Sequence, residues 1–147
     1  MTQQLLDLDE RPTRVASVTS NVRMKLVAFA IASLLPDCSS SFLLGKGDGT
    51  FVSAVDYPLD NNPGTITSGD FDGDGKQDLA TSSNNFDKFS LLVGKGDGTF
   101  WGAQSYPAGG YPNSVISADF NADGKLDLAV ANPDGNSVTV VLNSRCR

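Results

Sequence analysis

The sequence of 147 residues contains no histidine and only two cysteines, Cys38 and Cys146. Without histidine the chain lacks the commonest general base near neutral pH and the commonest imidazole ligand for metals. Zinc sites and Ser-His-Asp chemistry are therefore not expected. Glu10 is the only glutamate, and the aspartates lie in loops and turns, so we predict that the protein is not an enzyme. Two cysteines do not form a disulfide framework, and their disulfide state stays open.

Positive charge is also scarce, with 11 Lys and Arg against 17 Asp and Glu, which gives a net charge of −6. The negative charge is concentrated, because seven of the acidic residues belong to two stretches of nine residues, 70–78 and 119–127. This distribution indicates cation binding in two loops. It leaves no basic patch for a phosphate backbone, so nucleic acid is not expected as a partner.

Long apolar runs are missing too. The run over 26–35 contains ten residues, which is too few for a helix to span a bilayer. Preceded by Met24 and Lys25, it has the length of a signal-peptide core, but Pro36-Asp37 is a poor cleavage context. We favour the alternative that the run belongs to a degenerate first copy of a sequence repeat, which is called the worn first copy below.

The clearest feature that the sequence does contain is a repeat with a period of 49 residues. Gly45–Phe51 recurs letter for letter as Gly94–Phe100, and Tyr57-Pro58 recurs as Tyr106-Pro107. A phosphate-binding loop needs a helix after its glycines, and none is indicated here, so these heptads are interpreted as turns between strands.

Each copy is predicted to contain short strands separated by turns. The 15 glycines and the many Ser, Asn and Asp residues favour turns, and no window shows the helical period of 3.6. Residues 137–142 have apolar groups on both faces, which predicts a strand sandwiched between neighbours. We predict strands over 65–70, 77–82, 88–93 and 99–106 in one copy, and over 113–119, 126–131 and 137–142 in the next.

The two acidic stretches have the spacing of calcium loops. Calcium takes six to eight oxygen ligands, and alternate residues of one loop can supply most of them. Gly75 and Gly124 stand at the sixth offset, where the chain must bend sharply, often with positive φ. Phe71 and Phe120 lie between ligands, so their side chains are expected to pack into the sheet. The expected donors are Asp70, Asp72, Asp74, the Lys76 carbonyl and Asp78 in the first loop, and Asp119, Asn121, Asp123, the Lys125 carbonyl and Asp127 in the second.

Two other kinds of loop fit these stretches less well. An EF-hand is rejected, because the twelfth position holds Thr81 or Val130 instead of a bidentate carboxylate, and strands flank the loops. An acidic hairpin turn without metal is less favoured, because four carboxylates within nine residues repel one another strongly. Two Ca²⁺ sites are predicted. The site with Asn121 in place of Asp72 is expected to be the weaker, because its ligands carry one negative charge less.

The motif Asp-Phe-Asp/Asn-x-Asp-Gly-Lys-x-Asp-Leu-Ala, together with the heptad Gly-Lys-Gly-Asp-Gly-Thr-Phe, resembles the FG-GAP and VCBS repeats of integrin-α-like β-propellers. The resemblance covers about residues 40–143 well and 11–39 weakly. It implies an all-β, partial β-propeller of about three four-stranded antiparallel blades. We divide the single array, 1–147, into a degenerate blade over 11–58, a calcium-loop blade over 59–107 and a partial calcium-loop blade over 108–147.

The resemblance further implies a secreted or cell-surface calcium-binding module with a structural or adhesion role, recognising an unknown protein or glycan. The alternative is a carbohydrate-binding or accessory propeller segment of a larger secreted enzyme. Three blades are fewer than the four to eight of a closed ring, which predicts a fragment, an open fan of blades or a homo-oligomer. In the worn first copy the loop positions hold Thr19, Asn21, Arg23 and Val27, so no metal is expected there.

Overall fold

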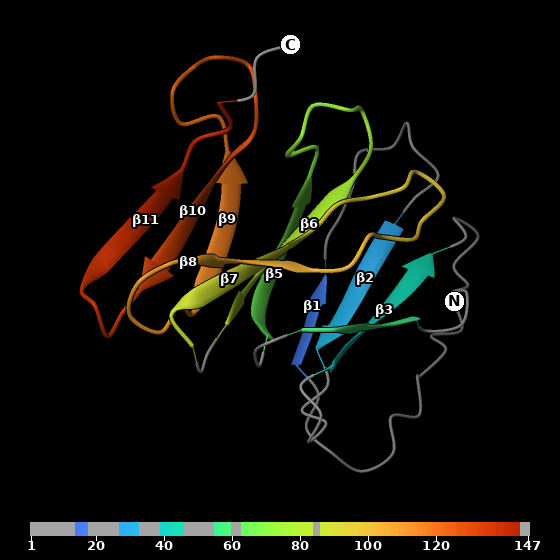
Figure 1. Cartoon of the computed structure of the whole chain (residues 1–147), viewed down its shortest axis with the longest axis horizontal. Helices are drawn as coiled ribbons and strands as arrows, with labels where there is room; N and C mark the ends of the chain where they lie inside the picture. The colour runs from blue at the N-terminus through green and yellow to red at the C-terminus, as the bar shows by residue number, and fades with distance from the viewer. Residues whose placement is uncertain are drawn as a thin grey trace, which may run out of the picture.

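The computed structural model describes residues 14–17, 27–32, 39–45, 55–59, 63–83 and 86–144. Within these ranges the chain consists of β-strands, turns and bends, as the all-β prediction requires (Figure 1). A search of the same residues finds no helix with the length and hydropathy to cross a membrane. Cys38 and Cys146 lie outside the described residues, as do Thr19, Asn21 and Arg23 of the worn copy.

The strands form three antiparallel sheets, each built from strands that are consecutive along the chain. None of the three sheets is closed. The first contains β1 (Arg14–Ser17), β2 (Val27–Ala32), β3 (Ser39–Gly45) and β4 (Val55–Pro58). The second contains β5 (Pro63–Gly69), β6 (Asp78–Ser83), β7 (Lys88–Leu92) and β8 (Gln104–Pro107). The third contains β9 (Ser114–Ala118), β10 (Asp127–Asn132) and β11 (Ser137–Val141). Figure 1 shows the sheets side by side in chain order.

The predicted strands agree with the observed ones, except that the prediction for 99–106 begins too early. The strand β8 begins at Gln104, because residues 94–100 form a tight turn. Gly96 and Gly98 have φ of +85° and +89° in this turn, and Gly94 and Phe100 form an isolated bridge across its base. The glycines thus reverse the chain before the strand resumes.

The strand β6 of the second sheet is buried on both faces, because its alternate side chains enter two different cores. Leu79 belongs to a cluster with Leu92 and Phe100, which also takes up Leu59 after the first sheet. Ala80 points to the other face, into a cluster shared with the third sheet. The members of that cluster are Phe71, Ala80, Phe89, Ala108, Val115, Leu128 and Val130.

The third sheet is covered on one face only, so the prediction of a sandwiched strand over 137–142 is wrong for half of its side chains. Val141 packs against the core shared with the second sheet. Val138 and Val140 are 64% and 50% exposed, and Ile116 on β9 is 57% exposed. No described residue covers this apolar face.

The backbone pairing also refines the register of the worn first copy. Leu79 of β6 pairs with Leu92, two residues before Gly94, whereas in the first sheet Phe29 pairs with Leu43, two residues before Gly45. Phe29 therefore corresponds to Leu79. The residue that corresponds to Asp78 is Ala28, one position beyond the expected Val27, and it too lacks a carboxylate.

Candidate metal centre

The two acidic loops connect equivalent strands in neighbouring sheets. The first joins β5 to β6, and the second joins β9 to β10. Figure 1 shows both loops at the same end of the sheets. The repeat thus places the same loop at the same position of each sheet, with the last aspartate of each motif as the first residue of the following strand.

The first loop folds around the carboxylate of Asp70. This carboxylate accepts hydrogen bonds from the backbone nitrogens of Gly73 at 2.6 Å, Asp74 at 3.1 Å and Gly75 at 2.8 Å. Gly73 and Gly75 have φ of +79° and +82°, so the expectation of a left-handed glycine at the sixth offset is confirmed. Asp72 accepts a further bond from the Asp74 nitrogen at 3.1 Å. These bonds hold the side chains of Asp70 and Asp72 on the inside of the bend.

Three of the four predicted carboxylates converge. One oxygen each of Asp70, Asp72 and Asp78 can be chosen so that all three atoms lie within 4.8 Å of one another. The carboxylate of Asp74 is not part of this group, because it forms a salt bridge of 2.7 Å with the Lys76 ammonium. The Lys76 hydrogen bond is also the main cause of the lowered pKa of Asp74.

Asp78 has a structural role that the sequence interpretation missed. It is fully buried, and its two oxygens accept hydrogen bonds from the backbone nitrogens of Phe71 and Gly94, both at 2.8 Å. Burial raises the pKa of Asp78, the two backbone donors act in the opposite direction, and the charges of Asp72 and Asp70 raise it further. A signal was available, because a spacing of 16 residues between the last aspartate and the second residue after the third strand recurs in both copies.

The second loop repeats this framework with three substitutions, which are Asn121 for Asp72, Ala122 for Gly73 and Leu126 for Gln77. Asp119 accepts hydrogen bonds from the nitrogens of Asp123 at 3.1 Å and Gly124 at 2.8 Å. The side-chain oxygen of Asn121 accepts from the Asp123 nitrogen at 3.0 Å, as Asp72 accepts from Asp74. Ala122 stands where the first loop has Gly73 and adopts a φ of +60°.

The buried acid of the second loop is Asp127, and the lysine pair is looser. Asp127 accepts hydrogen bonds from the nitrogens of Phe120 at 2.9 Å and Asn143 at 2.8 Å. Lys125 lies 3.4 Å from Asp123 and also donates to the Asn143 carbonyl at 3.5 Å. The counterpart of the converging trio is Asp119, Asn121 and Asp127, which contains two carboxylates instead of three.

The phenylalanines between the ligands differ from each other. Phe71 is 8% exposed in the core between the second and third sheets, as predicted. Phe120 is 44% exposed, so the prediction that it packs into the sheet is wrong. The reason is the open outer face of the third sheet, where no described segment is available to cover the ring.

The donor set of the first loop fits a hard divalent cation. Calcium prefers carboxylate and carbonyl oxygens, and this loop brings three carboxylates together. The backbone hydrogen bonds to Asp70 and Asp78 use only part of the acceptor capacity of each carboxylate, which has about four lone-pair sites. Asp74 and the Lys76 carbonyl lie on the same loop as further candidate donors.

The comparison with protein families agrees with this repeat architecture. The family model for the FG-GAP-like repeat matches the chain twice, at residues 29–81 and 70–130. The first match runs from β2 into β6, and the second contains both acidic loops. No curated protein and no solved structure matches the chain.

Proposed function

The chain belongs to the FG-GAP-like repeat family, and on that premise we propose that this repeat module of β-propeller type is a calcium-stabilised structural and recognition element without catalytic activity. Its three sheets would be two complete blades and one partial blade of a propeller. The observation that carries the proposal is the convergence of the Asp70, Asp72 and Asp78 carboxylates within 4.8 Å in the loop between β5 and β6.

Calcium would be held in the first loop by Asp70, Asp72 and Asp78, with the Lys76 carbonyl and Asp74 completing the set, and in the second loop by the corresponding residues. The metal supplies positive charge that offsets carboxylate repulsion. Hydrogen bonds within the chain also stabilise the loop, because the Asp78 carboxylate accepts from the backbone nitrogens of Phe71 in the loop and Gly94 after β7. At free calcium of about one hundred times Kd, one site adds about 2.7 kcal/mol to the free energy of unfolding.

Calcium would compete with the Lys76 ammonium for the carboxylate of Asp74. The ion pair is exposed, and exposed ion pairs of this kind contribute little to stability, so Lys76 is a weak competitor for a divalent cation. The Lys76 ammonium thus offsets part of the negative charge of the first loop.

The wider role that we propose is recognition of a protein or glycan by a secreted or cell-surface assembly. Aspartates committed to loops and the absence of histidine speak against catalysis. The uncovered apolar face of the third sheet, with Val138, Val140 and Ile116, supports self-association or assembly into a larger propeller. Light scattering tests this point. A monodisperse monomer of 15.4 kDa at high concentration in calcium would contradict self-association.

Titration calorimetry and thermal unfolding test the calcium proposal together. The wild-type chain is expected to bind calcium with a stoichiometry of two, and its melting temperature is expected to fall when a chelator is added. Asp70→Ala should abolish the first site. Asp97→Asn is the matched control, because Asp97 is an exposed aspartate in the turn before Phe100, where it caps Thr99. No heat of binding, together with identical melting in calcium and chelator, would refute the proposal.

A further inference from the structure

At the interface between the first and second sheets, the side chain of Phe100 is held by specific contacts. Tyr57 of β4 packs edge-on against Phe100 with ring centroids 5.7 Å apart and an interplanar angle of 80°. The Phe100 backbone nitrogen donates a hydrogen bond of 2.9 Å to the Tyr57 hydroxyl. Phe100 is 5% exposed and shares its cluster with Leu79 and Leu92. Phe100 thus fills the space between Tyr57 of the first sheet and the leucines of the second.

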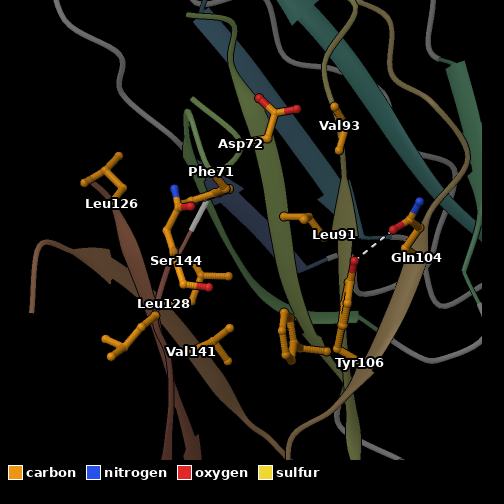
Figure 2. Close-up of a pocket in the computed structure, with 13 residues that line it drawn as sticks. Phe71, Asp72, Leu91, Val93, Gln104, Tyr106, Leu126, Leu128, Val141 and Ser144 are labelled. Atoms are coloured by element: carbon orange, nitrogen blue, oxygen red, sulfur yellow. Dashed lines mark hydrogen bonds between the residues drawn. The ribbon is translucent and has the colours of Figure 1, made fainter. Parts of the chain in front are cut away.

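The interface between the second and third sheets repeats this arrangement without the phenylalanine. By the 49-residue period, Tyr106 corresponds to Tyr57, and Leu128 and Val141 correspond to Leu79 and Leu92. No described residue of the third sheet takes the place of Phe100, and the Tyr106 ring stacks instead on Phe89 of its own sheet, with ring centroids 5.4 Å apart. Instead, a pocket of about 290 Å³ lies there, lined by Tyr106, Leu128 and Val141 among others (Figure 2).

The pocket has an apolar interior and a polar rim. Figure 2 shows Leu91 and Tyr106 on one side, facing Leu128 and Val141 on the other. Asp72, Gln104, Asn143 and Ser144 also line it and supply polar groups. Tyr106 is 38% exposed, and its hydroxyl donates to Gln104 at 2.8 Å. A cavity of about 150 Å³ accommodates benzene, so a phenyl ring fits this pocket with room to spare.

Among the residues that the structure describes, no strand of the third sheet carries such a ring. In the second sheet, β8 pairs with β7, whereas β11, the counterpart of β7, is an edge strand. The Asn143 nitrogen donates a hydrogen bond to Asp127 as the Gly94 nitrogen does to Asp78. The chain therefore leaves the second and the third sheet in the same way. In the second sheet, the turn that follows returns Phe100 to the bridge with Gly94. The pocket and the open edge are therefore continuous.

We propose that this pocket binds the aromatic side chain of an extended peptide that pairs with β11 as a fourth strand of the third sheet. The occupant has the chemistry of the segment 93–107, in which a Gly-Asp-Gly turn precedes a phenylalanine and a short strand. Backbone hydrogen bonds to the edge supply part of the affinity, and the ring in the pocket supplies selectivity. Phe71 and Asp72 of the first acidic loop and Leu126 of the second also line this pocket, so the site adjoins the calcium loops.

A synthetic peptide with the sequence of residues 93–107 tests the proposal against the full chain. Fluorescence polarisation of the labelled peptide is expected to show saturable binding, both in calcium and in chelator. A peptide with Phe100→Ala is expected to bind about tenfold to a hundredfold more weakly, since burial of the ring is lost. Equal binding of the two peptides, or binding of neither, would overturn the proposal. Calorimetry of calcium on the same sample reports separately on the calcium proposal.

Variants of the chain locate the binding site. Tyr106→Ala removes one wall of the pocket and is expected to weaken peptide binding about tenfold. Tyr111→Ala is the matched control, because Tyr111 is 49% exposed and does not line the pocket. Thermal unfolding establishes that both variants fold. Unchanged binding to folded Tyr106→Ala would overturn the assignment to this pocket, and the two peptides decide the matter on the unmodified chain if that variant does not fold.

Discussion

The buried carboxylate of Asp78 accepts a hydrogen bond of 2.8 Å from the backbone nitrogen of Gly94, 16 residues further along the chain. Its second oxygen accepts from Phe71, so one side chain joins the acidic loop, the start of β6 and the end of β7. Asp127 makes the same connections in the next sheet, to Phe120 and Asn143. The last aspartate of each motif therefore holds the fold together whether or not a metal is bound.

Asp78→Ala is expected to lower the free energy of unfolding by about 2–4 kcal/mol even in chelator, because two buried backbone donors lose their acceptor. Urea unfolding followed by circular dichroism measures the loss. Asp74→Ala is the control, since Asp74 is exposed and bonded mainly within its own loop, and it should have little effect in chelator. A loss for Asp78→Ala that appears only in calcium would contradict the structural role.

The fourth position of the acidic motif is a glycine in the first loop and an alanine in the second, so the exchange can be made in both directions. Gly73 and Ala122 both have left-handed backbone conformations, and a Cβ built at Gly73 meets no atom within 4 Å. Gly73→Ala should therefore cost about 1 kcal/mol, through conformation alone. Ala122→Gly should stabilise by about 0.5 kcal/mol, because relief of strain outweighs the greater freedom of the unfolded chain. Chemical denaturation in chelator measures both, and effects of the same sign would contradict this explanation.

The charge at the third position of the acidic motif, Asp72 or Asn121, should set the order of the two calcium affinities. Asn121→Asp is expected to tighten the second loop, and Asp72→Asn to weaken the first, since each exchange gives one loop the other's residue at this position. Calorimetric titration of each variant measures the change. The ranking would be wrong if Asp123→Ala removed the tighter of the two wild-type sites and Asp74→Ala the weaker one.

The stabilisation by calcium should grow as the pH rises. Burial raises the pKa of Asp78, so in the metal-free protein this group contributes stability at low pH that is lost as the pH rises through the raised pKa. Calcium requires the ionised carboxylate and competes with the proton, so its apparent affinity falls as the pH is lowered toward that pKa. Melting temperatures in calcium and in chelator across an acidic pH series test this expectation. A constant difference between the two would contradict it.

The local features of this protein could be predicted from its sequence because they depend on neighbours in the chain. Alternation of apolar residues and the glycine turns indicated the strands of the second and third sheets within one or two residues, except at the start of β8. The left-handed conformations of Gly75 and Gly124 followed from motif spacing. The bond from Gly94 to Asp78 was not predicted, because pairing across a sheet depends on register and not on local pattern.

By itself, the sequence determined the 49-residue repeat, the all-β class and the two acidic loops, since identity at a fixed period and carboxylate spacing are local properties. Only the tertiary structure decided which residues meet. Packing of the third sheet on the second buries Phe71 and leaves Phe120 exposed, although the two occupy the same position of the motif. It also separates Asp74 from the converging carboxylates and leaves a pocket beside Tyr106, because burial and contact depend on which sheet lies alongside.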